Sequence, residues 1–590
     1  MRVLIIVESP IKAFTISRIL KRKGIFKIFS VVATKGHIKD FPKSSLGIFF
    51  EESFGGIIVK PRFCLRDVVY FERLMREVKR ADEIYLATDP DREGEAIAYH
   101  LYEEIIRRFP GKKVYRARFY AVTEEEILQA LGRKESIDYN LYQAFLARKV
   151  VDRIIGWYMS GLVSRALGEK VSIGRVQTPG LCLINDSYEK HVKEGEKKEV
   201  YLEAILSPFY FAGLRYRVKV RSESFPDEIT AEKVKSGFSP FYRVVSVEKR
   251  SAKVNPPRTL TTTGLIKRCG EKYGFSAGKT MKIAQRLFEK GYITYPRTDS
   301  HRVSEKGLLL VQEYVRKRYG DEYLQLNTYE DVGERFSQDA HECIRPATMH
   351  AFYVEGLKLS RDEKVVLREI RDVFVASQMK PGFLEKVKIK VVNEGRSDVV
   401  LQGEGVRIIS NGFFVVLKDV LKDYEINEGY FFLKEGQVLG GYAGVEVKIV
   451  GRPPLETEES LIDKLEKKGI GRPSTYSQIV PSLLRRGLVR YVEEKKKEDE
   501  EKKKKEEVRR RVFIPTYTGK KLVRYLKKRQ SFIVDFDFTA RLEEELEKVA
   551  KGEKKMEDVV INVVDLLKKD GIRVRLMRRR GSKLWKWQET

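Results

Sequence analysis

Two short, unbroken apolar runs stand out in the first hundred residues, at 3–7 (Val-Leu-Ile-Ile-Val) and at 84–87 (Ile-Tyr-Leu-Ala). Continuous runs of this length are typical of strands that are buried on both faces of a parallel sheet. The first run is followed by Glu8 and the second by Asp89, and Ser9 then Pro10 suit the N-cap and first turn of a helix. Because open parallel sheets place their sites beyond the carboxyl ends of the strands, the two runs predict one shared acidic pocket.

Further along the chain, segments with helical periodicity are interspersed with segments of strand-like alternation. Alternation is clearest at 215–220 (Arg-Tyr-Arg-Val-Lys-Val) and at 444–450 (Gly-Val-Glu-Val-Lys-Ile-Val). A chain of 590 residues exceeds one hydrophobic core, so several domains are expected. We predict a multidomain α/β and α+β protein with an α/β domain at 1–134, a helical domain at 135–195 and 451–566, a β-rich arch at 196–256 and 381–450, a helical domain at 257–380 inserted into the arch, and a basic tail at 567–590.

The segment 493–511 is charged at every position except Val508, with Lys and Glu in alternating blocks. We expect a solvated helix or a loop there rather than a site. The abundance of Lys and Glu also favours a thermophilic source, because networks of such charges help mainly at high temperature.

The segment 291–300 (Gly-Tyr-Ile-Thr-Tyr-Pro-Arg-Thr-Asp-Ser) sets the hydroxyl of Tyr295 beside the guanidinium of Arg297. A free tyrosine has a pKa of about 10, so its phenolate is scarce at neutral pH unless a nearby positive charge or a base stabilises it. Arg297 could supply that charge, which indicates phosphodiester cleavage by a tyrosine nucleophile. The same residues also read as an ordinary alternating strand that ends at Pro296, and the segment alone leaves both interpretations open.

The segment 89–95 (Asp-Pro-Asp-Arg-Glu-Gly-Glu) gathers carboxylates directly after the second apolar run. Carboxylate oxygens bind hard cations, and a carboxyl group could also supply a proton to a departing sugar oxygen. Acids at the start of a helix favour the helix dipole without binding anything, so this turn is also ambiguous by itself.

A helical pattern at 281–290 places Gln285 and Glu289 four residues apart on one face, which could meet the tyrosine segment. The alternative is a solvated glutamate on an amphipathic helix. In 147–157, basic residues could follow phosphates and Trp157 offers a plane for base stacking, although a tryptophan in the core is an equal alternative.

The composition indicates a nucleic-acid partner, since 115 Lys and Arg against 85 Asp and Glu give a formal net charge of +30. Binding to a polyanion should therefore weaken steeply with salt. No apolar run approaches membrane-spanning length and the chain opens on a strand, so we expect no membrane contact and a cytoplasmic, nucleoid-associated location. The four cysteines contain no Cys-x-x-Cys pair, which argues against a disulfide framework and a zinc ribbon.

Six motifs, in order, resemble those of type IA DNA topoisomerases along nearly the whole chain. They are Glu8 with Ser-Pro-Ile-Lys12, the trio Asp89, Asp91 and Glu93, Ser-Ile-Gly-Arg-Val-Gln-Thr-Pro at 172–179, Thr-Tyr-Pro-Arg-Thr-Asp at 294–299, His-Glu-Cys-Ile-Arg-Pro at 341–346, and Gly-Ile-Gly-Arg-Pro-Ser-Thr-Tyr at 469–476. The resemblance implies a toroid whose first domain is a Rossmann-like Toprim domain. It also implies ATP-independent cleavage of single-stranded DNA through a 5′-phosphotyrosyl intermediate, strand passage and religation, which relax negative supercoils.

The same resemblance assigns roles residue by residue. Tyr295 would be the nucleophile, Arg297 would stabilise the phosphate, Glu8 would handle the leaving group's proton and Lys12 would face the phosphate. Mg²⁺ would be held by Glu8, Asp89, Asp91 and Glu93, and Gln285, Glu289 and His341 would complete the catalytic set. The DNA-contacting residues would be Arg148, Lys149, Asp152, Arg153, Trp157, Arg175, Gln177, Thr294, Thr298, Asp299, Arg345, Arg472, Ser474 and Thr475.

The chain departs from many relatives in lacking cysteine-rich zinc modules at its end. A basic tail after Asp570, with Trp585 and Trp587, could replace them in binding a strand, or could be a disordered end. The motif wording fits an archaeal or thermophilic member and does not separate a relaxing enzyme from a decatenating one of the topoisomerase III kind. We expect a monomer.

Three other classes of protein compete with this interpretation. A Toprim nuclease or primase would use the acids without a tyrosine. A DNA architectural protein would leave Glu8 and Asp89 unexplained. An ATP-driven motor is suggested by 274–280, but Tyr273 stands where the P-loop needs its first glycine, so no nucleotide is expected.

Overall fold

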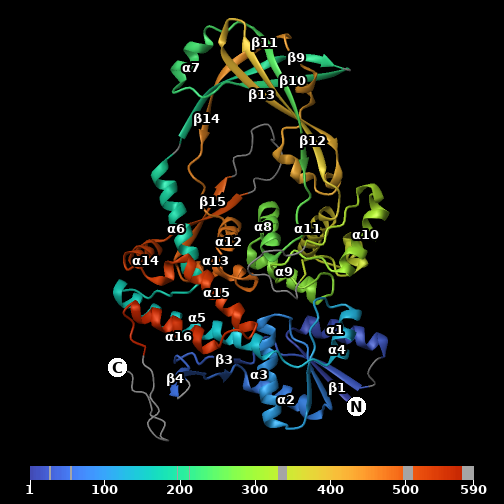
Figure 1. Cartoon of the computed structure of the whole chain (residues 1–590), viewed down its shortest axis with the longest axis vertical. Helices are drawn as coiled ribbons and strands as arrows, with labels where there is room; N and C mark the ends of the chain where they lie inside the picture. The colour runs from blue at the N-terminus through green and yellow to red at the C-terminus, as the bar shows by residue number, and fades with distance from the viewer. Residues whose placement is uncertain are drawn as a thin grey trace.

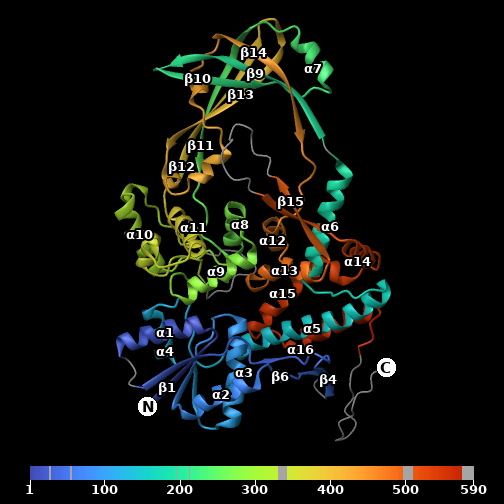
Figure 2. The same cartoon turned by 180° about the vertical axis from the view of Figure 1, so that it is seen from behind.

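The computed structural model describes residues 1–24, 28–53, 56–195, 197–211, 213–329, 342–495 and 509–574. His341 and the tail tryptophans Trp585 and Trp587 lie outside these residues, so their predicted roles stay predictions. Figures 1 and 2 show the N-terminal domain at one end of the long axis, a β-barrel at the other, and two columns of helices that join them into a ring. The predicted multidomain α/β and α+β architecture with a β-rich arch is confirmed.

The N-terminal domain is built on a four-stranded parallel sheet in the order β2-β1-β7-β8. Its strands are β1 (Arg2–Val7), β2 (Ile28–Ala33), β7 (Glu83–Leu86) and β8 (Lys113–Arg116). The two apolar runs of the sequence are the neighbouring central strands β1 and β7, and every residue of β7 is buried. Glu8 and the turn after β7 therefore lie at the same edge of the sheet.

Helices cover both faces of this sheet. They are α1 (Pro10–Lys23) and α4 (Glu124–Arg133) on one face, and α2 (Val68–Arg80) and α3 (Arg92–Arg108) on the other. The side chains of β1 divide accordingly, since Val3, Ile5 and Val7 join one core and Leu4 and Ile6 the other. Short strands extend the domain: β3 (Lys39–Asp40), β4 (Ile48–Ser53), β5 (Gly56–Pro61) and β6 (Cys64–Leu65).

The helical domain combines two segments that are far apart in the sequence. The first segment supplies α5 (Tyr139–Leu167) and α6 (Gln177–Glu194). The second supplies α12 (Glu458–Lys467), α13 (Pro473–Arg485), α14 (Tyr517–Lys528), α15 (Phe536–Ala550) and α16 (Met556–Lys569). One apolar core unites the two, with α15 and α16 packed along α5 (Figure 1). The long helix α5 therefore connects this domain to the N-terminal domain, because α3 also packs against it.

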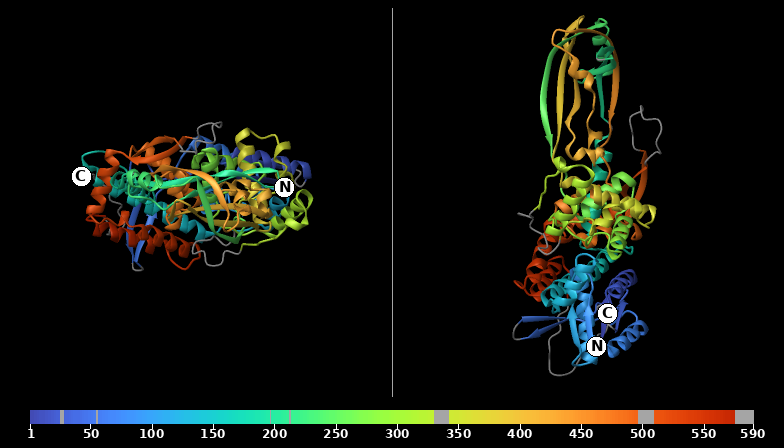
Figure 3. Two further views of the ribbon diagram at one scale, coloured as in Figure 1. Left: turned by 90° about the horizontal axis from the view of Figure 1, so that it is seen from above. Right: turned by 90° about the vertical axis from the view of Figure 1, so that its right-hand side faces the viewer.

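The arch is a closed six-stranded barrel in the order β10-β13-β12-β11-β14-β9. Its strands are β9 (Lys197–Phe211), β10 (Leu214–Arg221), β11 (Phe241–Val254), β12 (Gly382–Asn393), β13 (Arg396–Ser410) and β14 (Val438–Val450), with α7 (Glu228–Lys235) beside them. The barrel closes between β10 and β13 through the single residue pair Arg221 and Gln402. Seen edge-on in Figure 3, the barrel, the middle helices and the N-terminal domain follow one another along the long axis.

The tyrosine domain lies between β11 and β12 in the chain, so both of its connections run through neighbouring antiparallel strands of the barrel. Its helices are α8 (Thr262–Tyr273), α9 (Ala277–Glu289), α10 (Glu305–Arg318) and α11 (Arg361–Ser377). Short 3-10 helices complete it and the barrel at Asp321–Tyr323, Met349–Phe352, Val354–Gly356, Gly412–Val415, Lys418–Asp423 and Glu428–Phe432, and another, Phe532–Val534, precedes α15. Its core continues into the N-terminal domain around α1 and α4.

The expectation of a helix or loop at 493–511 was wrong at both ends of that segment. A hairpin of β15 (Val489–Lys495) and β16 (Arg509–Pro515) includes its first and last residues. Glu493 stands opposite Arg511 and Glu494 opposite Arg510, so residues of opposite charge face each other across the two strands at these largely exposed positions.

All four cysteines are free thiols. Cys64 is exposed, whereas Cys182, Cys269 and Cys343 are buried, and burial raises the pKa of each buried thiol to about 12. None of the helices in the described residues is both long enough and apolar enough to cross a bilayer.

Candidate active site

Tyr295 lies where the tyrosine domain meets the N-terminal domain, with its side chain 2% exposed. Its backbone N–H donates to the carbonyl of Tyr120 at 2.8 Å, and Thr294 forms a β-bridge with Ala121, so the two domains share main-chain hydrogen bonds here. The ring packs edge-on against Phe288 of α9 at 5.2 Å between centroids. The tyrosine segment is thus held from both domains.

The acid turn, residues 87–91, joins β7 to α3, and its shape is fixed by close contacts. Asp91 is the N-cap of α3 and accepts from the N–H of Gly94 at 2.7 Å. A Cβ on Gly94 would stand 2.1 Å from the carbonyl oxygen of Asp89, so only glycine fits there. The wholly buried Arg116 donates to that same carbonyl at 2.8 Å and pairs with Glu95 at 2.8 Å. Both contacts hold the turn against the sheet.

Glu8 and Lys12 reach the turn from the neighbouring strand end and its helix. The Nζ of Lys12 lies 2.8 Å from Asp89 Oδ1 and 3.4 Å from Glu8 Oε2, and Glu8 accepts from the backbone N–H of Asp89. Burial, reinforced by the charge of Asp89, raises the pKa of Glu8 to about 8. Burial would raise the pKa of Asp89 as well, but the charge and hydrogen bond of Lys12, together with Arg297 and Gln285, lower that pKa.

The tyrosine hydroxyl and Arg297 both point at the acid turn. The hydroxyl donates to Asp91 Oδ2 at 2.7 Å, and Arg297 Nη1 lies 3.5 Å from the same oxygen and 3.3 Å from Glu93 Oε2. Burial, with the Asp91 charge, raises the pKa of Tyr295 well above its ordinary value. Burial also raises the pKa of Asp91 although Arg297 opposes it. In this arrangement the phenol keeps its proton and shares it with Asp91.

Helix α9 completes the acidic side from the tyrosine domain. Gln285 donates to Glu289 Oε1 at 3.2 Å and to Asp89 Oδ2 at 3.4 Å. Burial raises the pKa of Glu289, which is 7% exposed. The two side chains share the face of α9 that meets the acid turn, in agreement with their spacing of four residues.

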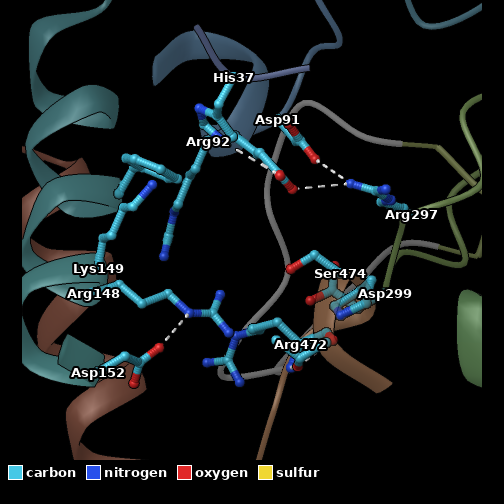
Figure 4. A pocket seen from close by; sticks show the side chains of 14 residues that line it. His37, Asp91, Arg92, Arg148, Lys149, Asp152, Arg297, Asp299, Arg472 and Ser474 are labelled. Carbon is cyan, nitrogen blue, oxygen red and sulfur yellow. Dashed lines mark hydrogen bonds and ion pairs between the residues drawn. The ribbon is translucent and has the colours of Figure 1, made fainter. Parts of the chain in front are cut away.

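A pocket of about 350 Å³ opens beside Arg297, and acidic and basic side chains both line it (Figure 4). We call Glu8, Asp89, Asp91 and Glu93, with Lys12 and Arg297, the acid cluster. We call Arg148, Arg175 and Arg472, with Glu543 and Asp152, the basic cluster. Asp91 and Glu93 line the pocket on one side, and Arg148 and Arg472 line it on the other. The pocket therefore suits a ligand that brings an anionic part to Arg148 and Arg472.

Most of the remaining residues predicted to contact DNA fall into two groups. Lys149, Asp152, Asp299, Ser474 and Thr475 line the pocket. Thr294, Thr298, Arg175 and Arg345 are at most 3% exposed, so their side chains support neighbouring segments from within. Arg345, for example, pairs with Glu342 at 2.8 Å beneath the tyrosine segment. Gln177 is half-buried at the start of α6.

Trp157 is 41% exposed, which excludes the alternative that its indole belongs to the core. The guanidinium of Arg153 lies 5.1 Å from the indole centroid. Arg153 also donates to the backbone carbonyls of Pro42 at 2.7 Å and of Ser45. Its guanidinium is therefore occupied by the loop before β4 and is not turned toward the pocket.

Three residues at the site were not foreseen from the sequence. His37 follows β2, stacks on Phe145 and lies 3.3 Å from Glu93, and that hydrogen bond, with Arg297, lowers the pKa of Glu93 to about 2. Arg92 lines the pocket and pairs with Glu547. Glu543 is wholly buried among arginines. His37 could have been found, because it follows the carboxyl end of a third parallel strand.

Among the described residues, no group of three or more His, Cys, Asp or Glu side chains lies in an arrangement that could hold a metal ion. The oxygens of Asp89, Asp91 and Glu93 instead face Lys12, Tyr295 and Arg297. Their chemistry nonetheless fits a hard divalent cation, because carboxylate oxygens are its preferred ligands and the charges of neighbouring carboxylates add to burial in raising the pKa values of Glu8 and Asp91.

Comparison with known proteins gives matches over almost the whole chain. A family profile described as DNA topoisomerase matches residues 136–561, and one described as Toprim domain matches residues 3–122. The chain is 35% identical over 571 residues to DNA topoisomerase 1 of Aquifex aeolicus, covering 95% of this chain and 98% of that protein. It is 32% identical over 563 residues to DNA topoisomerase 1 of Thermotoga maritima, covering 93% and 82%.

A solved structure is also similar, that of full-length topoisomerase I from Thermotoga maritima. The TM-score is 0.77 at 29% sequence identity, and the match covers 97% of this chain and 91% of that one. These matches confirm the resemblance that was drawn from the motifs.

Proposed function

Since the chain belongs to the type IA DNA topoisomerases, an enzyme family that changes DNA topology without ATP, we propose that Tyr295 is its nucleophile. The observation that carries this proposal is the buried hydroxyl, which donates to Asp91 at 2.7 Å with Arg297 beside the same carboxylate. A nucleophile that is paired with a base and a nearby cation is the arrangement that covalent catalysis requires.

In the proposed cleavage step, the Tyr295 oxygen forms a bond to phosphorus while the bond from phosphorus to the 3′ oxygen of the strand breaks. Asp91 is placed to take the phenol's proton, and Arg297 then stabilises the phosphate rather than the two carboxylates it now faces. Glu8 gives its proton to the departing 3′ oxygen, because its pKa of about 8 keeps it protonated at neutral pH. Religation reverses each transfer.

Mg²⁺ is the proposed cofactor. Asp89, Asp91 and Glu93, with Glu8 beside them, would hold it, and its charge would help to bind and orient the strand's phosphates. Lys12 is 1% exposed and bonded to two of these acids, so its part is to set their charge and position rather than to meet solvent.

The proposed substrate is a single-stranded segment of underwound DNA that passes along the pocket between the acid and basic clusters. Lys149, Ser474 and Thr475 support this path because they line the pocket, and Trp157 offers an exposed plane to a base. We further propose that the enzyme acts as a monomer, without a nucleotide, at the nucleoid. Relaxation is the preferred activity, and a decatenation assay alongside it would reveal a topoisomerase III-like preference.

The test is capture of the covalent intermediate. An oligonucleotide labelled at its 3′ end is incubated with the enzyme and denatured, and the label is expected to stay with the protein, because a 5′-phosphotyrosyl bond retains the downstream fragment. Tyr295→Phe should give no adduct, whereas Tyr292→Phe in the same segment should give the wild-type yield. Strand cleavage by Tyr295→Phe without an adduct would instead support a Toprim nuclease that activates water.

A further inference from the structure

Glu543 occupies an unusual place for a glutamate. It lies on the apolar side of α15, next to Leu542 and one turn from Leu546 and Thr539, and its side chain is 0% exposed. Fully buried glutamates are rare unless they are paired. The neighbouring Glu544 and Glu545 are only half-buried, so Glu543 alone in this run of three glutamates lies in the interior.

Three arginines from three separate segments meet at this carboxylate. Arg175 Nη1 lies 2.6 Å from Glu543 Oε1, Arg148 Nη2 lies 3.9 Å from the same oxygen, and Arg472 Nε lies 3.7 Å from Oε2. They come from the loop before α6, from α5 and from the loop before α13. Their guanidinium groups, although opposed by burial, hold the pKa of Glu543 well below its usual range.

The arginines of the basic cluster outnumber its carboxylates. Asp152 pairs with Arg175 Nε at 2.9 Å and with Arg148 at 4.0 Å, which leaves three guanidinium groups to two carboxylates. Buried Nη2 atoms of Arg148 and Arg175 make no hydrogen bond to any of the described residues. Because Arg148 and Arg472 line the pocket, the surplus positive charge faces the place where we propose that the DNA strand lies.

We infer that Glu543 is a positioning residue, which holds Arg148 and Arg472 at the pocket so that their guanidinium groups converge on one backbone phosphate of the bound strand. Glu543 acts through the arginines and does not touch DNA itself. The inference rests on the proposed function only in taking a DNA strand as the ligand of this pocket. Without the carboxylate, mutual repulsion would separate three guanidinium groups that are gathered in a low-dielectric interior.

One helical turn beyond Glu543, α15 also contacts the residue that follows the acid turn. Glu547 pairs with Arg92, which stands between Asp91 and Glu93 in the sequence and is 8% exposed. Residues four apart share a helix face, so α15 presents one carboxylate to the basic cluster and the next to the acid turn. It thereby sets the distance between the phosphate donors and the acids.

The sign of the effect on DNA affinity separates this role from two simpler ones. If Glu543 were only a negative charge near the strand, its removal would tighten binding. If it were only structural, its removal would lower the unfolding midpoint and leave the dissociation constant unchanged. A positioning role predicts weaker binding, because the convergent donors are lost although the net charge rises.

The experiment measures fluorescence anisotropy of a labelled single-stranded oligonucleotide over a series of salt concentrations. For Glu543→Gln we expect the Kd to rise about tenfold and the slope of log Kd against log salt to fall by about 0.7, the loss of one phosphate contact. The rate of adduct formation at saturating DNA should fall less than the Kd rises. Glu544→Gln, with the same change of net charge on the same helix, should match the wild type.

Two further variants keep the test decisive. Glu543→Asp retains the charge but withdraws it by one methylene, so we expect a smaller rise in Kd than for Glu543→Gln. If Glu543→Gln does not fold, Glu543→Asp serves as the test in its place. Unchanged or tighter binding by either variant overturns the inference. Tyr295→Phe should bind DNA like the wild type but form no adduct. An adduct formed by this variant would count against the proposed nucleophile and not against Glu543.

Discussion

The acid cluster and the basic cluster are inverse arrangements of buried charge on two sides of one pocket. In the acid cluster, four carboxylates share two cations, Lys12 and Arg297, and in the basic cluster three guanidinium groups share two carboxylates, Glu543 and Asp152. The acid cluster is therefore left with surplus negative charge and the basic cluster with surplus positive charge. A phosphodiester that carries a metal ion is complementary to both.

The two clusters differ in whether their charged groups can gain and lose protons near neutral pH. Carboxylates titrate, and here burial raises the pKa of Glu8 to about 8, whereas the hydrogen bond with His37 lowers the pKa of Glu93 to about 2. Protons are therefore present where chemistry needs them. Arginines do not titrate near neutral pH, so the basic cluster offers charge and donors of fixed position. The comparison teaches that proton transfer and anion binding are divided between the two sides.

The strongest way to break the acid side is to remove charge from its turn. Asp89→Asn with Asp91→Asn should reduce the rate of relaxation by about 10³-fold, the scale of lost acid–base catalysis. DNA affinity should stay level or increase, because negative charge has been removed beside a polyanion. A relaxation assay measures the rate and fluorescence anisotropy measures the affinity. Full relaxation activity in the presence of a chelator would exclude the proposed Mg²⁺.

The shape of the acid turn can be changed without altering any charge. Gly94→Ala would place a methyl group 2.1 Å from the Asp89 carbonyl, so the turn must move, and a displacement of this kind costs about a hundredfold in rate. Gly132→Ala is the matched control, because nothing lies within 4 Å of its new Cβ on α4. If the two variants relaxed DNA equally well, the turn would not need its close packing.

A buried carboxyl outside both clusters shows what burial does when it outweighs a nearby cation. Glu458 accepts from the N–H of Ala277 at 2.9 Å across the contact between α12 and α9, and burial raises its pKa to about 7. Its contribution to stability is fully present below pH 4.5 and is lost as the pH rises to 7, by up to about 3 kcal/mol.

Glu458→Gln should therefore flatten the fall in the free energy of unfolding between pH 4.5 and pH 7. Denaturant titrations at a series of pH values measure this slope, and the exposed Glu446→Gln controls for net charge. An unaltered slope in Glu458→Gln would mean that the carboxyl ionises normally in the folded enzyme.

The smallest expected effect comes from the basic side. Arg148→Ala removes one of three gathered guanidinium groups, so the Kd for single-stranded DNA should rise by about tenfold and the salt slope should fall by about 0.7. Arg541→Ala removes an exposed arginine of α15 that pairs with Asp535, and it should leave the slope unchanged. Equal slopes for both variants would remove Arg148 from the DNA path.

Much of the acid side could be predicted from the sequence because it depends on local signals. Apolar runs specify β1 and β7, parallel pairing brings their ends together, and the residues that follow must then share one edge. That Gln285 and Glu289 share one helix face followed from helical spacing alone. The resemblance to a family predicted that Tyr295 acts together with the acids at this edge of the sheet.

The basic cluster could not be predicted in the same way. Arg148 and Glu543 are separated by nearly four hundred residues, and no periodicity shows that α15 packs along α5. Thr294 and Arg345 resembled DNA contacts as motif letters, but they are buried supports of the tyrosine segment. Sequence patterns give the face of an element, whereas the partner of that face is a property of the tertiary fold.

The uneven burial of the four cysteines has a practical consequence for measurements on this enzyme. Thiol-reactive dyes attack thiolates, and a pKa of about 12 leaves almost none at Cys182, Cys269 and Cys343 near neutral pH. Cys64, exposed on β6, should thus accept a fluorophore in the unmodified protein. A second cysteine introduced on the barrel would then report by energy transfer, in single molecules, how the ring changes its length during a catalytic cycle.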